Sequence, residues 1–141
     1  MKNKDYTDAV NEEEYPEDPI VPLDPPFLDD RGGIQNLLNT PVQCASIITS
    51  KAGSVRSNHW HKTDFHYLYV MSGSMEYYER NVGLSTNPNA KPLIVKAGQM
   101  VFTPPNVIHK TVFLEDTVLL SFSKRNRDHA SHEADVIRED Y

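Results

Sequence analysis

Two histidines separated by a single residue, His59 and His61, are the residues whose type and spacing best suit chemistry. On a strand, residues two apart point to the same face with Cβ atoms about 7 Å apart, a span that one metal ion can bridge. His66 begins an apolar run after four intervening residues, and His109 follows a proline-rich turn. An imidazole can act as a metal ligand or as a base with a pKa near neutrality.

The segments that must position these histidines are short runs of β-branched and aromatic residues, separated by Gly, Asn, Pro or Asp. They cover residues 43–50, 65–72, 74–80, 92–98, 100–104 and 117–123. No apolar period of 3.6 residues persists for three turns, and only residues 128–140 could form a short helix. The sequence therefore predicts an all-β barrel or sandwich of antiparallel strands.

Charge and composition divide the chain. Residues 1–30 hold ten Asp and Glu against two Lys, whereas the remaining residues hold ten acids against twelve Lys and Arg, within a total net charge of −6. The chain is thus predicted as an acidic, proline-rich N-terminal arm (1–27), a barrel (28–125) and a C-terminal tail (126–141). A nearly neutral barrel without clustered cations argues against nucleic-acid binding.

The single cysteine, Cys44, excludes an intrachain disulfide and a thiolate metal cluster. No segment resembles a signal peptide, and no apolar run approaches the ~20 residues of a membrane span, so we expect no membrane association and a cytoplasmic location. The arm is either a solvated extension or a segment pinned across the barrel or a partner subunit by apolar residues such as Ile20 and Phe27. Because such an arm cannot pack alone, we expect a homodimer.

Two separate blocks resemble the motifs of the cupins. The first motif, Gly-x5-His-x-His-x4-Glu-x6-Gly, and the second, Gly-x5-Pro-x-Gly-x2-His-x3-Asn, are matched at Gly53, His59, His61, Gly73, Gly98, Pro104 and His109, with His66, Asn106 and Phe113 at the three positions that depart. The resemblance implies an antiparallel double-stranded β-helix, the jelly-roll barrel of the cupins.

The cupin resemblance also implies a metal site. In metal-binding cupins the motif residues ligate one divalent ion, so the ligands here would be His59, His61 and His109, with His66 as a possible fourth. An all-imidazole set suits zinc, iron, nickel or copper and lacks the oxygen ligand that favours manganese. Some cupins keep the motif histidines without a metal, so a metal-free site stays open.

A second resemblance is narrower. The segments FLDDRGGIQNL (27–37) and VRSNHWHK (55–62) resemble elements of the RmlC-like dTDP-sugar 3,5-epimerases and 3,4-ketoisomerases. In that group two arginines hold the diphosphate of a nucleotide sugar, and here they would be Arg31 and Arg56. Ser57 departs from the pattern, because the group has a glycine there. The alternative for these arginines is a surface ion pair, for example with Asp29 or Asp64.

The same resemblance implies proton transfer next to a ketone. A histidine would remove the proton, and a tyrosine or second histidine would return one. The candidates are His59 and His61 as base and Tyr69 as acid, with Tyr67 and Tyr78 as further tyrosines at the substrate. Most tyrosines of a small barrel serve packing. His129 and His132, near the C-terminus, are expected to be exposed.

Three functions stay open at this stage. The favoured one is an isomerase or epimerase acting on a sugar, sugar phosphate or nucleotide sugar. The second is a metal-dependent dioxygenase or lyase, and the third is a non-catalytic module that binds a small ligand or docks through its acidic arm. One fold hosts many chemistries, so the site must decide between them.

Overall fold

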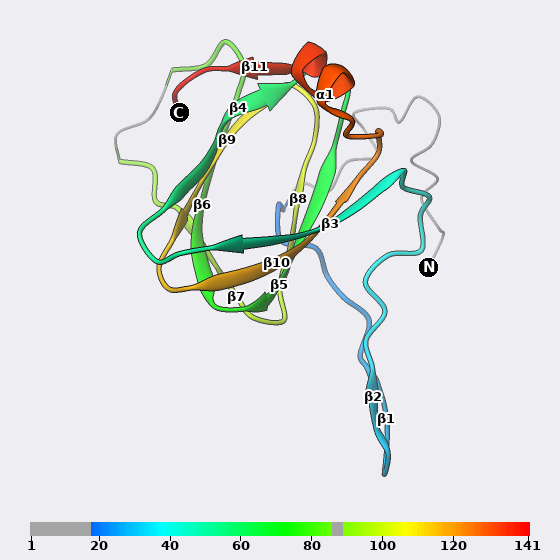
Figure 1. Cartoon of the computed structure of the whole chain (residues 1–141). Coiled ribbons are helices and arrows are strands. Elements are labelled where there is room, and N and C mark those ends of the chain that lie inside the picture. The colour runs from blue at the N-terminus through cyan, green and yellow to red at the C-terminus, as the bar shows by residue number, and fades with distance from the viewer. Residues whose placement is uncertain (1–17, 86–88) are drawn as a thin grey trace.

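The computed structural model describes residues 18–85 and 89–141 (Figure 1). Its elements in chain order are β1 (Phe27–Asp29), β2 (Gly32–Ile34), β3 (Cys44–Ser50), β4 (Val55–His61), β5 (His66–Ser72), β6 (Ser74–Asn81), β7 (Leu93–Lys96), β8 (Met100–Thr103), β9 (Val107–Phe113), β10 (Thr117–Ser123), α1 (His129–Asp135) and β11 (Val136–Arg138). The short β-rich runs of the sequence thus lie in strands, and the described residues contain one short helix, α1.

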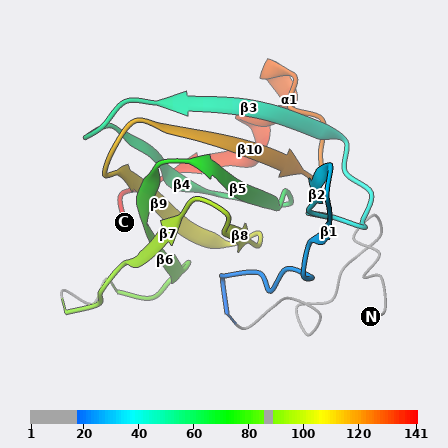
Figure 2. The ribbon, with the colours of Figure 1, turned by 90° about the horizontal axis from the view of Figure 1, so that it is seen from below.

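The barrel consists of two sheets that face each other (Figures 1 and 2). One sheet has the order β3-β10-β5-β8 and the other β11-β4-β9-β6-β7, and all pairs are antiparallel. The prediction of an all-β barrel of antiparallel strands is confirmed. No helix of the part of the chain that the structure describes is long and apolar enough to cross a membrane.

Two apolar clusters hold this arrangement together. The inner cluster fills the space between the sheets and consists of Leu68, Val70, Met75, Tyr77, Val95, Val101, Phe113 and Leu119. The outer cluster lies on the other face of the four-stranded sheet and consists of Phe65, Tyr67, Met100 and Phe102. Since successive strand residues point to opposite faces, β5 and β8 supply both clusters.

Residues 18–27, the described part of the predicted N-terminal arm, include Val21 and Leu23, which pack against the outer cluster. Val21 donates a backbone hydrogen bond to Met100 at 2.8 Å, and Phe102 donates one to Pro19 at 2.8 Å. These bonds occupy the free edge of β8, which would otherwise expose unpaired backbone groups. Residues 1–17, the most acidic part of the predicted arm, lie outside the described residues.

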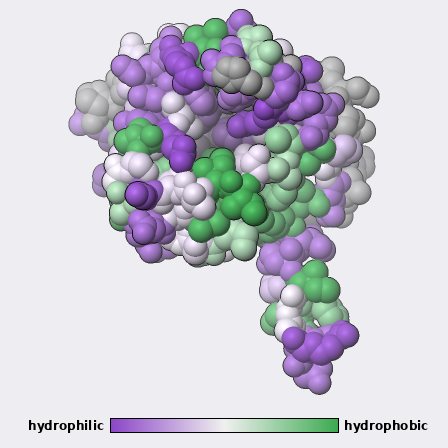
Figure 3. Space-filling view, viewed as in Figure 1, coloured by the Kyte–Doolittle hydropathy of each residue, from purple (hydrophilic) through white to green (hydrophobic). Residues whose placement is uncertain are grey.

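Two further segments extend beyond the expected barrel. The hairpin of β1 and β2 projects away from it (Figure 1), with Leu28 70% exposed. The segment predicted as a C-terminal tail forms α1 and then β11, which pairs with β4 and enlarges the five-stranded sheet. Figure 3 shows polar residues over this end of the molecule and an apolar patch over β3 and β10, where Ile47 is 73% exposed.

Candidate functional site

A bulge in β4 turns the polar side chains of this strand into the barrel. In the register with β9, Arg56 lies opposite Thr111 and His59 opposite His109, so one extra residue is accommodated between the two pairs. Ser57 and Asn58 adopt positive φ angles of 70° and 61° there. Such a bulge shifts the alternation by one residue. Arg56 and His59 therefore share the inward face although they are three residues apart.

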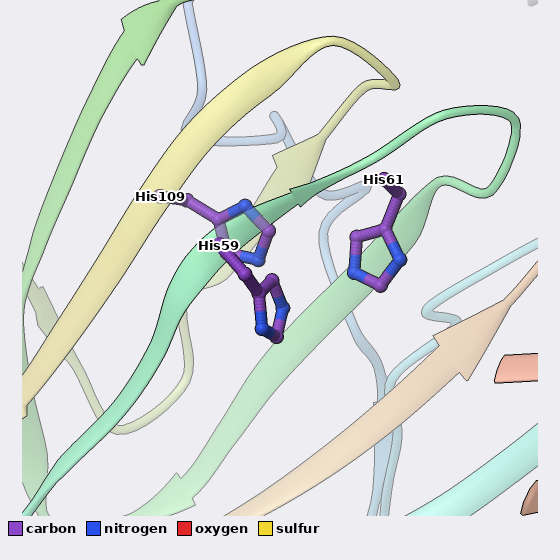
Figure 4. Close-up of side chains that lie close together, drawn as sticks. All are labelled: His59, His61 and His109. Atoms are coloured by element: carbon purple, nitrogen blue, oxygen red, sulfur yellow. The ribbon is translucent and has the colours of Figure 1, made fainter. Parts of the chain in front are cut away.

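The four predicted histidines meet inside the barrel. The ring centroids of His59 lie 4.8 Å from those of both His61 and His109 (Figure 4). One nitrogen of each of these three rings lies within 4.8 Å of the others. His66 enters from β5 in the opposite sheet, with its ring centroid 4.9 Å from that of His109. The set thus bridges both sheets.

Hydrogen bonding leaves the ring nitrogens available inside this cluster. His109 Nδ1 lies 3.1 Å from the Val107 carbonyl oxygen, to which it can only donate, so Nε2 carries the free lone pair. Within residues 18–85 and 89–141, His109 Nε2 and both nitrogens of His61 and His66 are buried and have no hydrogen-bond partner. Buried polar atoms are normally satisfied, and unpartnered imidazole nitrogens that converge fit a metal ion.

Burial also keeps the imidazoles uncharged. Desolvation, followed by the charges of neighbouring residues, lowers the pKa of His59 and His61 to about 3, and it lowers that of His66 well below its ordinary value. For His109, desolvation outweighs the hydrogen bond to Val107, and the pKa is again about 3. Neutral imidazole is the form that ligates metals, so the site meets this requirement near neutral pH.

Asp135, at the end of α1, supports His61 from outside the cluster. Its Oδ2 lies 3.5 Å from His61 Nδ1. The carboxylate is held by Thr63, whose backbone N–H and hydroxyl donate to Oδ1 at 2.9 and 2.6 Å, and by the Asp64 N–H. The Asp135 carboxylate therefore lies within ion-pair range of the His61 ring without forming a hydrogen bond to it, in the place from which a carboxylate can orient a ligating histidine. The sequence analysis missed Asp135 because it lies in the segment interpreted as a tail.

His132 also differs from expectation. It was expected to be exposed, but the structure half-buries it with its ring centroid 5.7 Å from that of His61. His132 lies on α1, which is joined to the loop after β4 by a hydrogen bond from the Lys62 backbone N–H to the Asp135 carbonyl. The side chain of His129 lies outside the described residues.

A tyrosine and a glutamate complete the polar interior. Glu79 on β6 lies opposite His109 on β9. The Tyr77 hydroxyl donates to Glu79 Oε2 at 3.0 Å and lies 2.7 Å from Thr103 Oγ1. Burial is the main cause that raises the pKa of both Glu79 and Tyr77. The sequence analysis missed this pair, although alternation along β6 puts Met75, Tyr77 and Glu79 on one face.

The tyrosines singled out from the sequence lie elsewhere. Tyr67 and Tyr69 face away from the histidines and pack in or against the outer cluster. Tyr78 points to the outer face of β6, where its hydroxyl donates to Glu76 at 2.7 Å and its ring lies beneath the Lys110 ammonium group. The structure therefore does not bring these three side chains to the cluster.

The two predicted arginines are separated as well. Arg31 lies on the projecting hairpin, with its side chain 84% exposed and paired with Asp29 at 2.5 Å, as the ion-pair alternative anticipated. Arg56 shares the barrel face of His59 at the opposite end of β4 from His61. It donates to Ser50 Oγ at 2.8 Å and to the Thr49 carbonyl at 2.9 Å, beside a cleft of about 550 Å³.

The chain matches one known protein family. The family model for the cupin domain matches residues 46–122, and the chain therefore belongs to the cupin family. No curated protein sequence matches the chain significantly.

Solved structures share the fold. The capsular polysaccharide assembling protein CapF of Staphylococcus aureus matches with 25% identity and a TM-score of 0.61, covering 85% of this chain and 35% of CapF. The chain thus spans about a third of CapF. The sugar 3,4-ketoisomerase QdtA of Thermoanaerobacterium thermosaccharolyticum, in complex with TDP, matches with 18% identity and a TM-score of 0.64, covering 82% of this chain and 83% of QdtA. A 3,4-ketoisomerase of Helicobacter canadensis has 21% identity and a TM-score of 0.68, covering 85% of this chain and 89% of its own.

Proposed function

We propose that this cupin is a metal-dependent isomerase or epimerase that moves a proton next to the keto group of a sugar, with nucleotide sugars as the substrate class. The observation that carries the proposal is the meeting of four neutral histidines with the Glu79–Tyr77 pair in one barrel. The likeness to sugar 3,4-ketoisomerases, one of them in complex with TDP, supports the choice of substrate class.

The histidines would serve as ligands. His59, His61 and His109, with His66 beside them, would hold one divalent transition metal such as zinc, iron, nickel or copper, which would polarise the substrate carbonyl. The unpartnered ring nitrogens are the feature that fits such an ion. Asp135 would keep His61 oriented for this task.

The base is better supplied by a carboxylate than by a histidine. His59 and His61, the bases implied by resemblance, have pKa values of about 3 and accept a proton poorly near neutral pH. Glu79 has a raised pKa and faces the cluster. It would take the proton from the carbon beside the carbonyl while the electron pair moves to the carbonyl oxygen. If the proton returns to the former carbonyl carbon, and the proton of the hydroxyl on the adjacent carbon passes to the oxygen that took the electron pair, the product is a ketoisomer. If a proton returns to the original carbon from the opposite face, the product is an epimer.

The test is solvent exchange followed by proton NMR. Zinc-loaded and iron-loaded protein in D2O is incubated with TDP-4-keto-6-deoxyglucose and with its UDP-linked counterpart. We expect loss of the proton signals at carbons next to the keto group, together with a new isomer. Folded, metal-loaded protein that exchanges no proton in either substrate would refute the proposal.

One observation favours a second function. His66 replaces the glutamate of the cupin motif, so the ligand set is all nitrogen and suits iron, copper or nickel. A metal-dependent dioxygenase or lyase would use such a set with open positions for its reactants. Oxygen uptake by iron- or copper-loaded protein with enol or diol substrates, without deuterium exchange in keto sugars, would favour it over the isomerase.

We also propose that the protein forms a homodimer through the projecting hairpin. Phe27, Leu28 and Ile34 are 60%, 70% and 63% exposed on a two-stranded hairpin, which is marginal on its own. A second copy would cover these side chains. Light scattering should give twice the mass of the chain, and a Leu28→Asp variant should shift this value toward the monomer. A monomeric wild-type protein would contradict the proposal.

A further inference from the structure

Arg127, in the segment between β10 and α1, has a largely buried side chain whose guanidinium has unused hydrogen-bonding capacity. Its Nε and one terminal nitrogen are buried without a hydrogen-bond partner among the described residues. Its nearest recorded ion-pair contact is from Nε to Asp64 Oδ2 at 3.6 Å, which is too long for a hydrogen bond. A guanidinium normally offers two parallel N–H donors to a carboxylate or phosphate.

Asp64 compensates this charge only weakly. The side chain is 4% exposed, and its Oδ1 already accepts the Arg125 backbone N–H at 3.0 Å. Its Oδ2 makes a 3.6 Å contact with Arg127 Nε, which is longer than a hydrogen bond. The positive charge of Arg127 therefore stays largely available to another acceptor.

The guanidinium lies near the histidine cluster. Its Nε lies 3.6 Å from Asp64 Oδ2, and one carboxylate oxygen of Asp64 lies within 4.8 Å of a ring nitrogen of His61. An anion held by Arg127 would thus lie beside any molecule that reaches the ring nitrogens.

We propose that Arg127 binds an oxyanion, a carboxylate or phosphate, of the molecule that occupies the barrel, by turning its unpartnered N–H groups from Asp64 to that group. The inference deepens the proposed function, since it selects acidic sugars or sugar phosphates among possible substrates. It concerns equilibrium binding and needs no turnover.

The test is calorimetric titration of the zinc-loaded 141-residue chain with three probes: glucuronate, thymidine diphosphate and neutral glucose. We expect at least one anionic probe to bind and glucose to bind far more weakly. Tighter binding of glucuronate would identify a carboxylate as the group that Arg127 binds, and tighter binding of thymidine diphosphate would identify a phosphate. The variant Arg127→Gln should weaken that binding by about tenfold or more, because two charge-assisted hydrogen bonds are lost.

Two further variants separate binding from structural support. Asp64→Asn removes the competing carboxylate and should tighten anion binding, whereas Arg125→Gln, an exposed neighbour, should leave it unchanged. If the Arg127–Asp64 pair is purely structural, Arg127→Gln and Asp64→Asn should both lower the melting temperature without changing the affinity for the anionic probes. That result, or a wild-type protein that binds neither anionic probe, would overturn the inference. Failure of deuterium exchange alone would refute the proposed reaction and leave this binding result standing.

Discussion

Glu79 on β6 lies directly opposite His109 on β9, so a carboxylate of raised pKa and a metal-competent imidazole face each other across adjacent strands. Side chains opposite each other on antiparallel strands have Cβ atoms about 5 Å apart. The Tyr77 hydroxyl, hydrogen-bonded to Glu79 Oε2, completes a polar group that separates the apolar half of the barrel from its histidine half.

Replacing Glu79 should abolish most of the proposed proton transfer. We expect Glu79→Gln to slow deuterium exchange by roughly a hundredfold or more, the usual contribution of a positioned base. Metal content should be unchanged because Glu79 is not in the ligand group. Tyr78→Phe, on the outer face of the same strand, is the matched control and should exchange at the wild-type rate. Equal rates in Glu79→Gln and Tyr78→Phe would exclude Glu79 as the base.

The pH profile of exchange should report the Glu79–Tyr77 hydrogen bond. The base acts when deprotonated, so the exchange rate should fall as the pH drops through the raised pKa of Glu79. Burial raises this pKa, and the hydrogen bond from Tyr77 partly offsets the rise. Tyr77→Phe removes that bond and should move the acidic limb of the profile to higher pH. A limb that stays in place or moves to lower pH would contradict this coupling.

The sequence was enough to predict the barrel and the convergence of four histidines. Both follow from local patterns, namely alternation along strands and spacing within two short blocks. The proton-handling pair could not be predicted, because it depends on the register of β6 against β9, which brings Glu79 opposite His109. Register is a property of the assembled sheet.

Long-range contacts explain the other differences. Asp135 lies beyond β10 in sequence, and only the return of α1 and β11 to β4 brings it to His61. Arg127 follows β10, whose end lies beside residues 64 and 65, and this long-range contact brings it to Asp64. The orientation of His59 relative to Arg56 depends on the bulge at Ser57 and Asn58, which puts the two residues on the same face of β4 although they are three positions apart. Tyr67 and Tyr69 lie close to His66 in sequence, but alternation along β5 places their side chains on the opposite face of the strand from His66.

Metal binding should require the histidine cluster inside the barrel and should not require His132, which lies beside it. We expect about one metal per chain in protein purified without chelator or nickel resin, measured by elemental analysis. His59→Ala and His109→Ala should lose it, and His66→Ala should bind it more weakly. His132→Ala is the control, since its ring lies outside the three-ligand group. Chelation should lower the wild-type melting temperature, because a ligand of the folded state stabilises it. Retention of the metal by His109→Ala would argue against this site.

The stability of the metal-free protein should fall in acid. The pKa values of His59 and His109 are about 3 in the folded chain against an ordinary value of 6.5. Between these values the unfolded chain binds more protons, so stability is complete above about pH 6.5 and is lost as the pH falls toward 3. We expect the melting temperature, followed by circular dichroism, to drop on the order of 10 °C between pH 7 and pH 4. The drop should be smaller in His109→Asn, which cannot titrate at that position. A pH-independent melting temperature would contradict the lowered pKa values.

The bulge in β4 offers a test of backbone strain beside the site. Ser57 has a φ of 70°, a left-handed conformation that costs most residues about 1–2 kcal/mol and glycine little. Ser57→Gly should therefore stabilise the protein by up to about 1 kcal/mol once the greater flexibility of glycine in the unfolded chain is subtracted. Asn106, with a φ of 62°, is the matched control, and Asn106→Gly should gain less because asparagine tolerates this conformation. Ser57→Val should be less stable than the wild type, because a β-branched residue adopts this left-handed conformation less readily than serine. Urea unfolding measures all three, and a Ser57→Gly variant less stable than the wild type would show that the serine side chain itself stabilises the bulge.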